Sequence, residues 1–248
     1  MQDSHTVHAY DQELAQLETL IARMGGLAEA QLETGVRALV RRDSDLASRG
    51  VAADPKIDAL DQEVHAQSVR LLALRQPVAV DLRTCVGTLK VSGDLERMGD
   101  YGANIAKRAM VLNQLQRVEP AKSLPRLSEM VRGLVHDVVD AFLERDADKA
   151  SAVWHRDSEV DELYGSFFRE LVTYMMEDAR TITACTHLMF VAKNIERIGD
   201  HCTNVAETVQ FLVRGETFPG ARSQAQPTVA PEAGKAPEAP AVTDGSQK

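Results

Sequence analysis

The chain has few aromatic residues, few cysteines and no excess of basic side chains. Its 248 residues carry 28 Lys and Arg against 37 Asp and Glu, for a net charge of −9, so we expect no nucleic-acid binding. Three cysteines without a Cys-x-x-Cys pair indicate a reducing compartment, and we expect the cytoplasm. No apolar run approaches the roughly 18 residues of a membrane span, and the first residues lack the layout of a signal peptide.

The residues that are abundant favour helices. Gly and Pro are sparse before residue 215, and Leu, Ala, Glu and Arg dominate, so an all-α fold is expected. The segment 215–248 holds five of the nine prolines and a single aromatic residue, Phe218. Because it has too little apolar surface to fold on its own, we expect a disordered C-terminal tail.

The sequence before this tail repeats itself. A shift of 103 residues places Arg42 and Asp43 over Arg145 and Asp146, and a shift of 100 places ERMGD (96–100) over ERIGD (196–200). The difference of three residues falls between the second and third helix of each half, as expected for a loop. We therefore predict two tandem, pseudo-symmetric three-helix bundles at 7–118 and 119–214, followed by the tail at 215–248.

The predicted third helix of each half carries an apolar stripe at alternating spacings of four and three residues, which is typical of a long helix in a left-handed bundle. The stripe also contains Cys202, which we therefore interpret as a core residue and not as a ligand. Its members are Val91, Leu95, Met98, Gly102, Ile105, Ala109 and Leu112 in the first half, and Val191, Ile195, Ile198, Cys202, Val205, Val209 and Leu212 in the second.

Acidic residues form a second line on the same helices. Glu96, Asp100 and Asn104 follow one another at intervals of four, on a different face from the stripe. If the chain reverses near Pro77, the second helix places Asp58 opposite Glu96 and Asp54 opposite Asp100. A reversal between Asp178 and Ala179 pairs the second half in the same way. The two predicted sets are Asp54, Asp58, Glu96, Asp100 and Asn104, and Asp157, Asp161, Glu196, Asp200 and Asn204.

Four carboxylates in one place repel one another unless a cation joins them, so each set predicts a metal site. Oxygen ligands suit Mg, Mn, Ca or Fe, and the lack of well-placed His or Cys argues against zinc or copper. A solvent-exposed acidic face is the alternative, and Asp54 before Pro55 also suits a helix N-cap. Gly99 and Gly199 indicate either a close helix contact or room for a metal cluster.

The sequence contains no Walker loop, no G-x-G-x-x-G, no nucleophile elbow and no Glu-x-x-His of a di-iron oxygenase, so we expect no enzyme. Two alternatives stay open at this point. A metal-dependent phosphohydrolase could use paired metals to bind phosphoryl oxygens. A purely structural helical scaffold would need neither the metal nor the acids.

At ERMGDYGAN and ERIGDHCTN, each preceded by a D-x-x-x-D helix, the chain resembles the PhoU family, and the resemblance spans residues 7–214. It implies a cytoplasmic, non-catalytic negative regulator of phosphate uptake and of the phosphate-starvation response. It also implies metal ions (Fe, Mn or Mg) at both acidic sets, a homodimer, and as partners the phosphate ABC transporter ATPase and a phosphate-sensing histidine kinase. Pro55 and Lys56, where the second half has Ser158 and Glu159, make the first site less acidic than the family pattern.

Overall fold

Helices make up nearly all of the described chain. The computed structural model describes residues 2–75 and 78–218, and within these residues there are seven α-helices, two short 3-10 helices and no strand. This confirms the all-α prediction. The elements in chain order are α1 (Gln2–Arg41), α2 (Ser44–Ala53), α3 (Pro55–Arg75), α4 (Val80–Leu112), η1 (Glu119–Lys122), α5 (Leu124–Glu144), α6 (Ala147–Glu177), η2 (Ala179–Thr181) and α7 (Ile182–Arg214).

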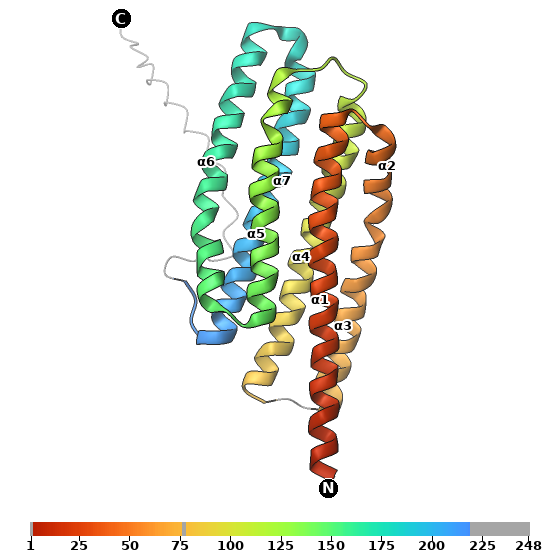
Figure 1. The fold of residues 1–248 in the computed structure, drawn as a ribbon, viewed down its shortest axis with the longest axis vertical. Coiled ribbons are helices and arrows are strands. Elements are labelled where there is room, and N and C mark those ends of the chain that lie inside the picture. The colour runs from red at the N-terminus through yellow and green to blue at the C-terminus, as the bar shows by residue number, and fades with distance from the viewer. Residues whose placement is uncertain (1, 76–77, 219–248) are drawn as a thin grey trace, which may run out of the picture. The chain divides into compact units, whose positions relative to one another are not determined.

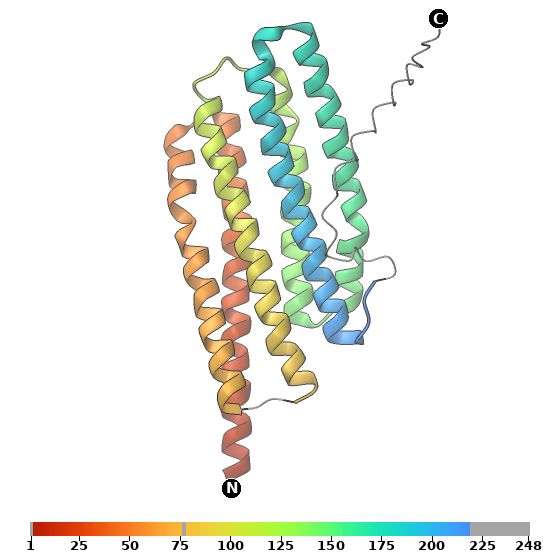
Figure 2. The ribbon, with the colours of Figure 1, turned by 180° about the vertical axis from the view of Figure 1, so that it is seen from behind.

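The helices form two bundles that share one core. In the first half, α1 to α4 pack on one another, and in the second half α5, α6 and α7 do the same. The halves meet where α4 lies against α7 and α1 lies against α5, as Figures 1 and 2 show. None of the described helices is long and apolar enough to cross a membrane.

The turn after the first helix of each half has the same geometry, as the repeat predicts. Arg42 and Arg145 both adopt a left-handed backbone with φ of 56°. The aspartate that follows each of them caps the next helix, because Asp43 accepts from the amide of Leu46 at 2.8 Å and Asp146 accepts from two amides at 2.9 Å. A short R-D sequence thus ends one helix and begins the next in both halves.

One difference from the predicted three helices per half lies at Pro55. The second helix of the first half is divided into α2 and α3, whereas α6 is continuous through the equivalent Ser158. Proline has no amide hydrogen for the helical bond, so the ladder breaks there. Asp54 keeps helical dihedral angles (φ −49°, ψ −50°). The predicted N-cap at Asp54 is therefore wrong, because an N-cap residue has an extended backbone.

The apolar stripe of the third helices is buried, as predicted. Every member is buried except Leu212, which is half-buried, and Cys202 is completely enclosed. α1 and α4 lie close together at Gly35. A Cβ there would lie 2.9 Å from Ile105 Cγ2 and 3.2 Å from the backbone oxygen of Gly102. The crossing of α1 over α4 therefore depends on the absence of a side chain at residue 35.

The folded body extends further towards the C-terminus than predicted. Gly215 ends α7 with a φ of 73°, and Phe218 then returns to the bundle. Its ring stacks on Trp154 of α6 with 5.0 Å between centroids, and only 6% of the residue is exposed. Residues 215–218 are thus ordered and not part of a tail, because this stacking buries the one aromatic residue of the segment. The remainder of the predicted tail, 219–248, lies outside the described residues.

Candidate metal centres

The first half brings its four predicted carboxylates together at the contact of α3 with α4. Burial raises the pKa of Asp54, and the negative charges of Asp100 and Asp58 raise it further. Burial and the charge of Asp100 likewise raise the pKa of Glu96, to which Asp58 also contributes. These mutual effects place Asp54, Asp58, Glu96 and Asp100 in one electrostatic group, as the antiparallel pairing of the two helices predicts.

Two basic side chains, Arg97 and Lys107, lie close enough to these carboxylates to offset part of their charge. Arg97 donates to Asp100 at 3.2 Å, and its Nε lies 3.6 Å from an oxygen of Glu96. Lys107 lowers the pKa of Asp54, but less than burial raises it. Asp54 also accepts a hydrogen bond from the buried Gln31 on α1 at 3.3 Å. Repulsion among the carboxylates is reduced but still present.

In the second half, Glu196 is the most enclosed carboxylate of its set, with 8% of the residue exposed. Burial raises its pKa, and the charges of Asp200 and Asp161 add to the effect. Lys193, one turn earlier on α7, opposes this by donating to Glu196 at 2.6 Å. Asp161 itself is exposed on α6.

Asp157 lies on the side of α6 that faces α7. One of its carboxylate oxygens is 3.8 Å from the position that a Cβ would take at Gly199. Burial raises the pKa of the Cys202 thiol well above its usual value, and the charges of Asp157 and Asp200 contribute. The second half therefore gathers Asp157, Asp161, Glu196 and Asp200 around one short stretch of the α6 and α7 contact.

The two predicted asparagine ligands lie differently. Asn204 donates from Nδ2 to Asp94 on α4 at 3.3 Å, and His201 Nδ1 lies 2.8 Å from the same oxygen. Asn204 thus takes part in the contact between the two halves. Asn104 is half-buried, and it has no side-chain hydrogen bond to another described residue.

Asp61 also belongs to the first group, although the repeated pattern of acids does not predict it. Its charge raises the pKa of Glu96, and its carboxylate accepts a hydrogen bond from Ser92 at 2.8 Å. Asp61 follows Asp58 by three residues, so it lies on nearly the same helix face. The spacing of acids in DPKIDALD (54–61) indicates this position, but the equivalent residue of the second half is Tyr164, so the acid at 61 is not repeated.

Gly99 and Gly199, at equivalent positions of α4 and α7, meet different surroundings. A Cβ at Gly99 would lie 2.6 Å from Cδ1 of the buried Ile57, so close packing against α3 explains the glycine. At Gly199 the nearest side-chain atom is 3.5 Å away, on Val160. That is an ordinary contact distance, so packing does not explain the second glycine.

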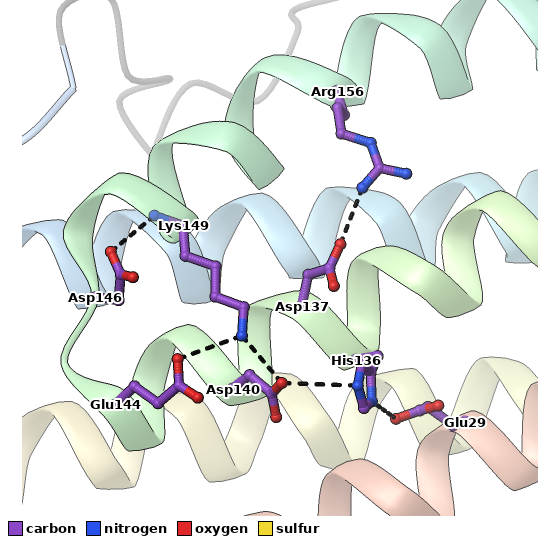
Figure 3. A network of polar contacts seen from close by, with 8 residues as sticks. All are labelled: Glu29, His136, Asp137, Asp140, Glu144, Asp146, Lys149 and Arg156. Carbon is purple, nitrogen blue, oxygen red and sulfur yellow. Dashed lines mark hydrogen bonds and ion pairs between the residues drawn. The ribbon is translucent and has the colours of Figure 1, made fainter.

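Another acidic cluster provides a contrast. On α5 and α6, Lys149 bonds to both Asp140 and Glu144, and Arg156 bonds to Asp137 at 2.9 Å (Figure 3). His136 lies between Asp140 and Glu29 of α1 in the same figure. Each of these acids thus has a hydrogen bond or ion pair with a lysine, an arginine or a histidine, whereas no such bond within the described residues reaches Asp58 or Asp161 of the predicted sites.

In residues 2–75 and 78–218, no three His, Cys, Asp or Glu side chains are arranged to hold a metal ion. Ligation at either site would require the carboxylates to turn towards a common point. The donor set still fits a hard cation. All its ligands are carboxylate or amide oxygens, and burial together with the neighbouring carboxylates raises the pKa values of Asp54, Glu96 and Glu196.

Comparison with known proteins agrees with this architecture. The profile of the PhoU domain matches twice, at residues 21–109 and 124–209. The phosphate-specific transport system accessory protein PhoU homolog of Caulobacter vibrioides is 50% identical over 219 residues, which cover 88% of this chain and 95% of that protein. The Escherichia coli K12 protein named phosphate-specific transport system accessory protein PhoU is 36% identical over 216 residues, covering 87% and 90%.

Solved structures agree as well. The crystal structure of PhoU from Pseudomonas aeruginosa superposes with a TM-score of 0.81 at 38% identity, over 84% of this chain and all of that one. The phosphate transport system regulatory protein PhoU from Streptococcus pneumoniae gives a TM-score of 0.78 at 28% identity, over 85% and 99%. With a duplicated domain profile, relatives matched over nearly their full length and the same helical fold, the chain belongs to the PhoU family.

Proposed function

We propose that the protein is a negative regulator of phosphate uptake and of the phosphate-starvation response, acting as a non-catalytic adaptor in the cytoplasm. The observation that carries the proposal is the 50% identity, over 95% of its length, to a relative named as an accessory protein of phosphate-specific transport. The name of the Streptococcus pneumoniae structure adds a regulatory role for that protein.

We propose that a bound metal ion changes the charge of the surface at the two groups of carboxylates. Asp54, Asp58, Glu96 and Asp100 would hold a cation in the first half, with Asn104 beside them. Asp157, Asp161, Glu196 and Asp200 would do so in the second, with Asn204 at the same end of the group. Iron, manganese or magnesium suits these oxygen donors. The bound ion supplies positive charge that neutralises the carboxylates and turns an acidic surface into one that a partner can approach.

The proposed partners are the ATPase of the phosphate ABC transporter and a phosphate-sensing histidine kinase, with the protein itself a homodimer. An adaptor needs two such surfaces, and the internal repeat supplies two related but unequal ones. Pro55 and Lys56 in the first site, against Ser158 and Glu159 in the second, give the two surfaces different charge.

Gene deletion tests the regulatory role. In phosphate-rich medium we expect the deletion strain to express phosphate-uptake genes that the parent represses, and the wild-type gene on a plasmid to restore repression. Co-purification of the tagged protein with the transporter ATPase and the kinase, each co-expressed singly, tests the two partners. Unchanged expression in the deletion strain would contradict the proposal.

Metal content tests the sites themselves. A variant with Glu96→Gln, Asp100→Asn, Glu196→Gln and Asp200→Asn removes the third-helix carboxylates while keeping their shape. A control variant with Glu63→Gln, Glu129→Gln, Glu162→Gln and Glu177→Gln removes the same charge from four exposed residues. Elemental analysis should find metal in the wild type and the control and little in the first variant. Equal metal in all three proteins would rule out the proposed ligands.

A further inference from the structure

An open groove with apolar walls runs between the beginning of α4 and the end of α7. Its volume is about 470 Å³, and on α4 it ends at Lys90, six residues before Glu96. Leu82 and Val86 form one wall and Phe211 the other. These side chains remain 43%, 46% and 43% exposed, so the groove presents three neighbouring large apolar residues to solvent.

The internal repeat shows how this groove differs from the equivalent region at the other end of α4 and α7. At the opposite end of the α4 and α7 pair, the residues equivalent to Gly87 and Thr208 of the groove are His187 and Arg108. There the Arg108 guanidinium lies 4.1 Å from the ring centre of Phe190 and donates to His187 Nδ1 at 3.2 Å. Arg108 thus packs over Phe190 at that end, although Phe190 is still 51% exposed, whereas Gly87 and Thr208 provide no such side chain in the groove.

The α4 wall is positively charged. Arg83 and Lys90 line the groove, and neither has a hydrogen bond or ion pair with another described residue. They are seven residues apart, which is two helical turns or about 10 Å. Glu207 on the α7 wall offsets part of this charge. Two cations with no partner among the described residues are notable in a chain with a net charge of −9.

We propose that this groove binds an acidic amphipathic helix of a partner protein. The partner's apolar side chains pack between Leu82, Val86 and Phe211, and two carboxylates seven residues apart face Arg83 and Lys90. A helix fits because the α4 wall spans just over two turns and because residues seven apart share one helix face. The inference rests on the proposed adaptor function, since an adaptor requires a surface for a partner.

Labelled peptides test the proposal on the full-length protein. The probes are 18-residue helical peptides with leucines at positions i, i+4 and i+7, flanked by a pair of Glu or a pair of Lys seven residues apart. By fluorescence anisotropy, we expect the Glu peptide to bind the wild type about tenfold or more tightly than the Lys peptide. The variant Arg83→Glu, Lys90→Glu should reverse this preference, and Leu82→Asp should weaken the binding of both peptides.

A matched control separates the groove from general electrostatics. Arg126→Glu, Arg169→Glu changes the net charge by the same amount at exposed positions outside the groove. This control should keep the wild-type preference for the Glu peptide. Equal affinity for both peptides, or a reversal in the control as well, would overturn the proposal.

A second copy of the chain is the competing occupant, and sedimentation tests it. Self-association of the wild type that Leu82→Asp abolishes would show that the groove is a dimer contact and would overturn the partner helix. Failure of the peptide assay leaves the proposed regulatory role standing, because that role is measured by gene expression. Unchanged gene expression in the deletion strain would remove the regulatory role without affecting the peptide result.

Discussion

Gly99 in α4 and Gly199 in α7, at equivalent positions of the repeat, provide a matched pair for a stability test. Replacing either by alanine favours the helix by about 1 kcal/mol, because glycine has more backbone freedom to lose on folding. At Gly199 no side-chain atom is closer than 3.5 Å to the new methyl group, so we expect the variant Gly199→Ala to gain about 1 kcal/mol of stability.

At Gly99 the same methyl group would lie 2.6 Å from Ile57 Cδ1, and Ile57 is completely buried. Overpacking of this kind costs about 1 to 3 kcal/mol. After the helix gain is subtracted, Gly99→Ala should be up to about 2 kcal/mol less stable than the wild type. The two variants should therefore differ by roughly 1 to 3 kcal/mol, or several degrees in Tm.

Urea unfolding followed by circular dichroism, with metal removed by a chelator, measures both variants on the same scale. Equal stability of the two variants would refute the packing explanation for Gly99. The metal content of Gly199→Ala provides a second test. Since packing does not require glycine at 199, we expect Gly199→Ala to fold well but to bind less metal, because its methyl group lies 3.8 Å from an oxygen of Asp157. Full metal binding by this variant would show that the glycine does not leave room for the ion.

Three further predictions concern other parts of the molecule. The folded-state pKa values of Asp54 and Glu96 are raised, so the stability they contribute at low pH is lost as the pH rises through those values. Asp54→Asn and Glu96→Gln should therefore stabilise the metal-free protein at pH 7 and do so less at pH 4. Urea titrations at both pH values would contradict this if the gain were larger at pH 4. Phe218→Ala should shift the emission of Trp154, the single tryptophan, to longer wavelength and cost about 3 kcal/mol, because a buried ring is lost together with its stacking. An unchanged spectrum would argue against the stacking. Asp146→Ala removes the cap of α6 and should cost about 1 kcal/mol in thermal unfolding, whereas the exposed Glu177→Ala should change little.

Regular, local features were predictable from the sequence alone. The all-α class follows from composition, and the duplicated architecture follows from the two shifts of 103 and 100 residues. The meeting of Asp58 with Glu96 and of Asp54 with Asp100 was also predictable, because adjacent antiparallel helices bring residues together at equal distances from their turn. The R-D turns at Arg42 and Arg145 repeated in the structure as they do in the sequence. In all of these cases the information lies within one helix or one hairpin.

Contacts between distant segments were decided by the tertiary structure. Asn204 matches the ligand pattern, yet its amide bonds to Asp94 of the other half, and Phe218 stacks on Trp154. The open groove beside Phe211 likewise depends on which side chains of α4 meet those of α7. Helix periodicity states which face of a helix is apolar, but it does not state which other helix that face meets. That pairing depends on the packing of all the helices at once.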